Sequence, residues 1–293
     1  MKRLLRLFIV TSFLFILSGC FKTEELDNAD IYTTTYPIEY LVSELYGYNS
    51  KVKSIYPNGV DINEYTLSNN KIKKYSKGDL FVYNGLTDEK KIAASFVNRN
   101  SRLKIIDVSE GLAIKNSYHE LWLNPTNYLM LAQNVKNGLK QYIESKITKE
   151  TIDENYNSLK VQLSEFETTL KTLGNNGTYT TIIVSKDYFK FLENYGFEVI
   201  SLEETDELNN DTINRAKNLI KEKNNKFIYV TDLEANNENY NDAINEVKKA
   251  GAEIKSLHTL TVLTSEEREK NENYATLMRD NIELLKEEIY KEK

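Results

Sequence analysis

Side chains that could do distinctive chemistry are few in this chain of 293 residues. It has two histidines, His119 and His258, and one cysteine, Cys20. A single thiol excludes an internal disulfide. The sequence also contains no glycine-rich phosphate loop, no nucleophile elbow and no pair of carboxylates in a catalytic pattern. We therefore do not predict an enzyme, and the chemistry that remains is that of binding.

The cysteine follows a segment typical of secretory signals. Three basic residues among the first six precede an apolar run over 7–17, and this run is short of the roughly 20 residues that a membrane-spanning helix needs. The segment Leu17-Ser-Gly-Cys20 resembles the bacterial lipobox, which implies cleavage before Cys20 and lipidation of its thiol. The alternative is a plain secretory signal in which Cys20 is incidental, but the absence of any other cysteine argues against it. We predict a protein anchored by lipid on the extracytoplasmic face of the cell membrane.

Length and charge restrict the architecture and the partners. The formal net charge is −6, and removal of residues 1–19 takes away three further positive charges. An acidic chain of this kind lacks the basic surface that nucleic acid requires, so nucleic acid is not an expected partner. The length exceeds that of a usual single core and predicts two domains.

Short runs rich in β-branched and aromatic residues alternate with amphipathic segments along most of the chain. We predict strands at 31–36, 52–56, 80–83, 103–108, 179–184, 197–202, 227–231 and 253–257, and helices near 38–47, 69–75, 88–97 and 272–291. Strands that alternate with helices predict parallel sheets covered by helices, which is the α/β class.

A long helix is predicted between the two sets of strands. Apolar residues repeat there at alternating steps of four and three, which places them on one helix face; they are Ile152, Tyr156, Leu159, Leu163, Phe166, Leu170 and Leu173. After a break near 147–148, Thr151 and Glu154 fit a capping box, and Gly174 fits a C-terminal stop. A coiled coil is the alternative, but about three heptads are few for one. We predict a helix packed along both lobes.

Several stretches, in order, resemble the metal-specific solute-binding lipoproteins of zinc and manganese importers. The segment 31–37 resembles their opening strand and proline, and 56–65 resembles a Pro-x-Gly-x-Asp-Pro-His-x-Tyr loop. The segment 76–85 matches the following strand and turn, and 120–125, Glu-Leu-Trp-Leu-Asn-Pro, resembles His-x-Trp-Leu-Asp-Pro. In the second half, 184–189 is similar to Ser-His-Asp-Ala-Phe. This resemblance implies two α/β lobes with parallel sheets, bridged by a long rigid helix, with cargo held between the lobes and passed to an ABC permease.

The positions that hold metal ligands in that family carry other residues here. By the resemblance they are Asn63, Glu120, Lys186 and Thr261, whereas the family has three histidines and an acidic residue. A lysine ammonium has no lone pair to offer a metal. We expect Lys186 to stand in the cleft like a bound cation and to pair with Glu120, which would hold the lobes together without metal.

A second set of candidate ligands lies close to those positions in the sequence. It comprises Glu64, His119, Glu120, Asp187 and His258. Histidines with carboxylates suit zinc or manganese as the transported ion, and oxygen ligands favour manganese. The family's histidine-rich loop is absent from 109–118, which disfavours zinc. Residues one step along a strand also point to its opposite face, so this set can equally miss the cleft.

The predicted organisation has five parts. Residues 1–19 are the signal, 20–30 a polar tether, 31–125 the N-terminal lobe, 126–174 the helical connection and 175–293 the C-terminal lobe. Trp122 is expected in the core. We predict a monomeric solute-binding protein of a metal-type ABC importer, with a permease partner and a divalent ion as possible cargo. The alternatives are a metal-free interaction or adhesion lipoprotein on the same fold and a binder of a small organic ligand.

Overall fold

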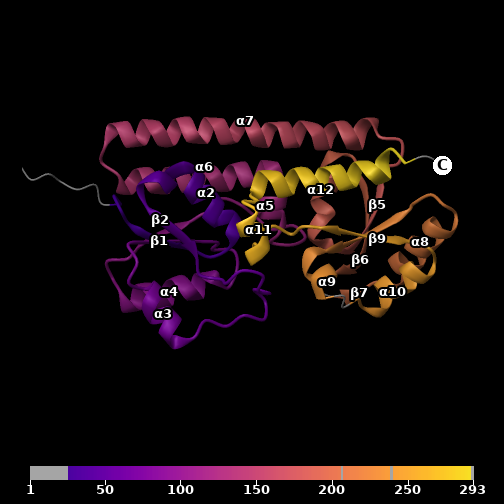
Figure 1. The fold of residues 1–293 in the computed structure, drawn as a ribbon, viewed down its shortest axis with the longest axis horizontal. Helices are drawn as coiled ribbons and strands as arrows, with labels where there is room; N and C mark the ends of the chain where they lie inside the picture. The colour runs from indigo at the N-terminus through magenta and orange to yellow at the C-terminus, as the bar shows by residue number, and fades with distance from the viewer. Residues whose placement is uncertain (1–25, 206, 238–239, 292–293) are drawn as a thin grey trace, which may run out of the picture.

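The computed structural model describes residues 26–205, 207–237 and 240–291, which form two α/β lobes lying beneath one long helix (Figure 1). The first sheet has the strand order β2-β1-β3-β4, and all its neighbours pair in parallel. Its strands are β1 (Asp30–Thr33), β2 (Lys51–Ser54), β3 (Leu80–Tyr83) and β4 (Lys104–Asp107). The predicted parallel arrangement is confirmed in this lobe.

Helices cover both faces of the first sheet. Helices α2 (Tyr36–Tyr46) and α6 (Pro125–Tyr142) share a core with Leu80 and Val82 of β3. Helices α3 (Asn69–Tyr75) and α4 (Glu89–Arg99) pack against Phe81 on the opposite face. Since successive strand residues point to opposite faces, an uninterrupted apolar strand such as β3 needs helices on both sides.

The second sheet has the order β7-β6-β5-β8-β9. Its strands are β5 (Thr181–Lys186), β6 (Glu198–Glu204), β7 (Glu207–Leu208), β8 (Phe227–Thr231) and β9 (Glu253–Leu257). Helices α8 (Asn210–Lys221) and α10 (Asp242–Lys249) cover one face, and α12 (Tyr274–Ile289) lies on the other. The short edge strand β7 pairs antiparallel and was not predicted, because two exposed residues carry no periodic pattern.

The long helix α7 (Lys146–Asn176) spans both lobes and its apolar face is buried as predicted. The predicted ends were wrong. The helix begins after Ser145, whose side chain accepts a hydrogen bond from the Thr148 amide, and it continues through Gly174 to Gly177. Thr151 makes no cap, because its hydroxyl donates back to the Ile147 carbonyl inside the helix. The first turn carries no apolar stripe, so periodicity alone could not reveal it.

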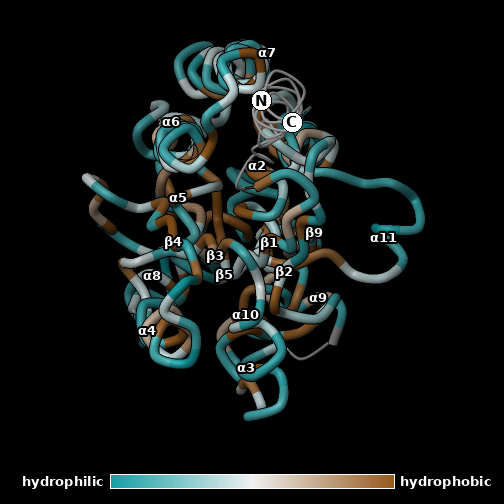
Figure 2. The backbone as a smooth tube through the Cα atoms, turned by 90° about the vertical axis from the view of Figure 1, so that its left-hand side faces the viewer, coloured by the Kyte–Doolittle hydropathy of each residue, from teal (hydrophilic) through white to brown (hydrophobic). Residues whose placement is uncertain are grey.

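One continuous hydrophobic core joins the lobes through this helix. It includes Leu41 and Leu139 from the N-terminal side, Leu159 and Leu170 from α7, and Leu285 from α12. Figure 2 shows hydrophobic residues along the strands in the interior and mostly hydrophilic residues along α3 and α10. A shared core of this kind makes the relative position of the two lobes rigid.

The predicted tether is shorter than expected. Leu26 is fully buried, Ala29 is almost fully buried, and the Ala29 carbonyl accepts a hydrogen bond from the Lys51 amide. Residues 26–30 therefore belong to the N-terminal lobe, since burial of Leu26 stabilises them there. The predicted signal segment 1–19 and the anchor Cys20 lie outside the described residues. Within the described part of the chain, no helix is both long and apolar enough to cross a membrane.

The remaining short elements lie near the junction and the loops. They are η1 (Gly47–Asn49), α5 (Glu120–Leu123), η2 (Asp187–Tyr195), α9 (Asp232–Asn237) and α11 (Ser265–Glu269). Two of them, α5 and η2, begin at residues that the sequence singled out for binding chemistry.

Candidate functional site

A cleft of about 1050 Å³ opens where the carboxyl ends of the two sheets face each other. The N-terminal lobe contributes the segments that follow β2, β3 and β4, and the C-terminal lobe contributes Asp187 and Tyr188 after β5 and Thr205 after β6. In open α/β sheets, ligands bind outside the carboxyl ends of the strands. The cleft is therefore the candidate binding site.

Contacts outside the lining of this cleft hold the two lobes together. The Trp122 indole N–H donates to the Thr259 carbonyl at 2.8 Å, and the Tyr195 hydroxyl donates to Asn124 Oδ1 at 2.7 Å. Arg268 makes two hydrogen bonds, of 2.9 and 2.8 Å, to the Glu39 carboxylate. Trp122 is buried, as predicted. Paired, geometrically specific contacts of this kind preorganise a site.

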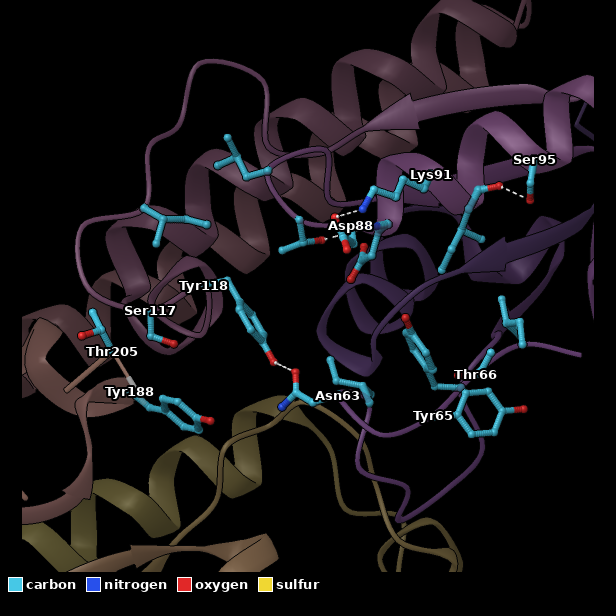
Figure 3. Close-up of a pocket in the computed structure, with 18 of the residues that line it drawn as sticks. Asn63, Tyr65, Thr66, Asp88, Lys91, Ser95, Ser117, Tyr118, Tyr188 and Thr205 are labelled. Atoms are coloured by element: carbon cyan, nitrogen blue, oxygen red, sulfur yellow. Dashed lines mark hydrogen bonds and ion pairs between the residues drawn. The ribbon is translucent and has the colours of Figure 1, made fainter. Parts of the chain in front are cut away.

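Three rings are stacked beside the cleft. The His119 imidazole lies between Tyr118, with ring centroids 4.2 Å apart, and Tyr188, with ring centroids 3.7 Å apart, and both pairs are nearly parallel. Tyr118 also donates a hydrogen bond from its hydroxyl to Asn63 Oδ1 at 3.1 Å (Figure 3). This stack joins the N-terminal lobe to η2 of the C-terminal lobe.

His119 is held in its neutral form. Burial lowers the pKa of the imidazole to about 3, and the positive charge of Lys186 lowers it further in the same direction. Its Nδ1 is 2.8 Å from the Ser117 hydroxyl. The imidazole therefore carries no charge at neutral pH and can exchange hydrogen bonds only as a neutral group.

The predicted ion pair between Glu120 and Lys186 is wrong. Glu120 is buried and its carboxylate accepts hydrogen bonds from the Lys115 amide and, at 3.5 Å, from Asn116 Nδ2. Lys186 pairs instead with Glu203 on the neighbouring strand β6, its register partner in the sheet. Because strand pairing places Glu203 beside Lys186, the lysine has its acidic partner within its own lobe.

The other candidate ligands lie apart from this region. His258 Nε2 is 3.1 Å from Glu267 Oε1 and 3.7 Å from Asp232 Oδ2, and its Nδ1 accepts the Leu260 amide. Thr261 is buried, and its hydroxyl has no hydrogen-bond partner. His258 is thus engaged within the C-terminal part of the chain.

Two further candidates, Glu64 and Asp187, contribute little to a cluster. Glu64 is exposed, and Asp187 is buried with its Oδ2 accepting the Thr205 amide at 3.1 Å. Among the described residues, no three histidine, cysteine or acidic side chains are placed to hold one metal ion. The donors named from the sequence therefore do not fit a bare divalent ion in this structure.

Sequence reasoning missed the aromatic lining of the cleft. Tyr56, Tyr65, Tyr118 and Tyr188 all line it. With twenty tyrosines in the chain, no single one stood out. The usable signal was position, because Tyr56 ends a predicted strand and the other three lie in segments that follow predicted strands.

A buried carboxyl also lines the cleft and supplies a pH-dependent test. Burial raises the pKa of Glu89 to about 7, and the nearby Asp107 carboxylate acts in the same direction, while a hydrogen bond from the Asn84 amide opposes it. Between an unfolded pKa of about 4.3 and this value, the folded state binds a proton that the unfolded state lacks. Stability should therefore fall as the pH rises through that window.

Glu89→Gln should remove this dependence. We expect the wild type to lose roughly 1 to 2 kcal/mol of unfolding free energy between pH 5 and pH 8 relative to the variant, since glutamine stays neutral and still accepts from Asn84. Urea unfolding at several pH values measures it, with the exposed Glu64→Gln as the control. Parallel pH profiles for wild type and Glu89→Gln would contradict the assignment.

Comparisons with known proteins agree with this architecture. The family described as "Zinc-uptake complex component A periplasmic" matches residues 31–288. The high-affinity zinc uptake system protein ZnuA of Bacillus subtilis is 23% identical over an alignment of 321 residues, which covers 97% of each chain.

Two solved structures share the fold. Zinc-bound AdcA of Streptococcus pneumoniae superposes with a TM-score of 0.72 at 21% identity, over 90% of this chain and 58% of that one. The laminin-binding protein Lmb of Streptococcus agalactiae, described as having adhesin and metal-transporting activity, gives 0.73 at 19% identity, over 89% of this chain and 99% of that one.

Proposed function

We propose that the chain captures its cargo in the cleft between the lobes, because it belongs to the family of periplasmic zinc-uptake components. It is thus a solute-binding protein of a metal-type ABC import system. We further propose that lipidated Cys20 holds it, as a monomer, on the outer face of the cell membrane. A membrane permease is the partner that this family implies, and the family is not one of enzymes.

The cleft at the carboxyl ends of both sheets is the observation that carries the proposal. Both lobes line it, and the inter-lobe contacts of Trp122 and Arg268 hold the two lobes together. A site shared by two lobes can present cargo to a permease that docks across them both. The position of the cleft supports the role, whatever the chemistry of the cargo.

Zinc is the ion named for the relatives, and for this chain we propose zinc-linked cargo that is not held by the family's four ligands. Asn63 accepts a hydrogen bond from Tyr118, and Lys186 forms an ion pair with Glu203. The Glu120 carboxylate accepts a hydrogen bond from the backbone of the loop that precedes it. A bare zinc ion needs about four close nitrogen, sulfur or oxygen donors, and these side chains are committed elsewhere.

Adhesion is the alternative role for this fold. Its structural support was to be an ion pair between Glu120 and Lys186, and neither residue makes it. We therefore propose capture for import in preference to adhesion.

The function is tested by Cys20→Ala in the organism that makes the protein. We expect the variant to leave the membrane fraction and to lose labelled palmitate, because its anchoring acyl chain is gone. Import of isotopically labelled zinc should fall towards that of a deletion strain. Ser18→Ala keeps a small residue before the cysteine and should behave as the wild type. Membrane retention without Cys20, or unchanged import in the deletion strain, would refute the proposal.

A further inference from the structure

We infer that the cleft binds a positively charged organic molecule, an inference that rests on the proposal that this cleft is the cargo site. The size of the cleft is the first step. Its volume of about 1050 Å³ is slightly above the range of roughly 300 to 1,000 Å³ that is typical of sites for small organic ligands. A single ion with one or two waters would need only about 30 Å³ for each of its components.

Aromatic rings line the cleft on several sides. Tyr118 and Tyr188 project into it from the two lobes, and Tyr65 lies across from them in Figure 3. His119 stacks on Tyr118 and Tyr188 and so fixes their ring planes. Rigid tyrosine rings attract cations through their negative faces, by about 0.5 to 2 kcal/mol each.

The charges of the lining select for a cation. The acidic residues are Asp88, Glu89 and Asp187, and Lys91 is the one basic residue among the described lining residues. Lys91 is paired with Asp88 at 2.9 Å, so it is neutralised locally. Because burial raises the pKa of Glu89 to about 7, that carboxyl is only partly charged at neutral pH, and Asp187 supplies most of the remaining negative charge. The net charge of the lining is therefore negative, which favours a cation over an anion.

Polar uncharged groups suit the body of an organic ligand. Thr66, Ser95, Asn116 and Thr205 line the same space and offer hydroxyl and amide groups. Apolar side chains, among them Ile114, lie between them. Sparse polar groups among apolar surfaces are typical of sites that orient a small molecule.

Two sources share this chemistry. One is an alkylammonium compound, and the other is a cationic complex between a metal ion and an uncharged organic chelator. Both present a diffuse positive charge on an organic body, but only the second agrees with the zinc-linked cargo proposed above, since it would bring zinc without any direct protein ligand. The same titration distinguishes them.

The test is calorimetric titration of the full-length chain in detergent with two matched pairs of probes. One pair is choline and its uncharged tert-butyl isostere. The other is the zinc complex of bipyridine and bipyridine alone, with zinc alone as a further control. We expect at least one cation to bind about tenfold more tightly than its uncharged counterpart. The pair that shows the difference identifies the source.

Variants locate the binding. Tyr188→Leu and Asp187→Asn should each weaken the preferred cation by about threefold to tenfold. Tyr48→Leu, which changes a tyrosine that is 98% exposed outside the cleft, should leave the affinity unchanged. Circular dichroism checks that each variant folds. Because two different cleft residues are changed, the test remains informative if one of the variants does not fold.

Equal affinities for each cation and its uncharged counterpart would overturn the inference, as would the absence of binding by both cations. Unchanged affinity in both cleft variants would also overturn it. These results concern the purified protein alone. Failure of the import proposal would appear instead as unchanged zinc import in cells, so the two failures are distinguishable.

Discussion

Trp122→Ala should lower the free energy of unfolding by about 4 kcal/mol, the largest stability effect expected of any single change at the site. The indole is 1% exposed, its N–H bonds across the lobes to the Thr259 carbonyl, and its ring packs edge-on to His119. Its own carbonyl accepts the Tyr274 hydroxyl at 2.7 Å. Alanine would leave a cavity in the junction, and the Thr259 carbonyl would lose the hydrogen bond from the indole N–H.

Trp122→Phe is the matched control, and urea unfolding is the measurement. Phenylalanine keeps most of the volume and loses the hydrogen bond, so we expect a cost of about 1 to 2 kcal/mol. Equal losses in the two variants would assign the effect to the hydrogen bond, and a loss below about 1 kcal/mol in Trp122→Ala would contradict the role of this residue in the junction.

Glu120→Ala should cost about 2 to 3 kcal/mol of stability and leave zinc retention unchanged. The carboxylate is 4% exposed and accepts from the Lys115 amide and the Asn116 side chain, so its removal leaves those donors without a partner. A metal ligand would behave in the opposite way, because its loss abolishes metal retention and relieves strain among clustered donors.

Two further variants, Glu120→Gln and Asn116→Ala, measure how much each hydrogen bond contributes to this loss of stability. Glutamine retains one acceptor oxygen and should cost about half as much, and Asn116→Ala removes only the longer of the two hydrogen bonds. Unfolding and metal content are measured on the same preparations. Loss of bound zinc in Glu120→Ala, without loss of stability, would show that the carboxylate is a ligand.

The fold was largely predictable because its signals are local. Strands β3, β8 and β9 have the predicted bounds, since each is a short β-prone run between turn-forming residues. The buried face of α7 followed from its repeat of apolar residues. Its first turn carries a local cap at Ser145 but no apolar repeat, so periodicity could not reveal it. The burial of Leu26 in the core depends on segments distant in sequence, which no local pattern records.

The sequence indicated where the candidate cleft lies but not how its side chains are arranged. The resemblance pointed to Asn63, Glu120 and Lys186, and Asn63 does line the cleft. The partners of the other two could not be read from the sequence. Lys186 meets Glu203 because β5 and β6 pair in one register, and Glu120 turns to its own loop. Both outcomes are questions of side-chain direction, which sequence spacing does not determine.

The stack of Tyr118, His119 and Tyr188 shows the same limit. Two of its members are adjacent in sequence, and the third comes from the other lobe. His119 looked like a metal ligand because histidine often is one. In the structure tyrosines from the two lobes cover its ring faces and burial lowers its pKa, and sequence spacing records neither.

The most direct test of the central claim, that this cleft lacks the family's bare-metal site, is the metal content of the purified chain. The protein is loaded with zinc or manganese, dialysed extensively and analysed by mass spectrometry beside His119→Ala. We predict substoichiometric metal that is equal in the two proteins. Near-stoichiometric metal in the wild type that disappears in His119→Ala would contradict the account and restore a direct metal site.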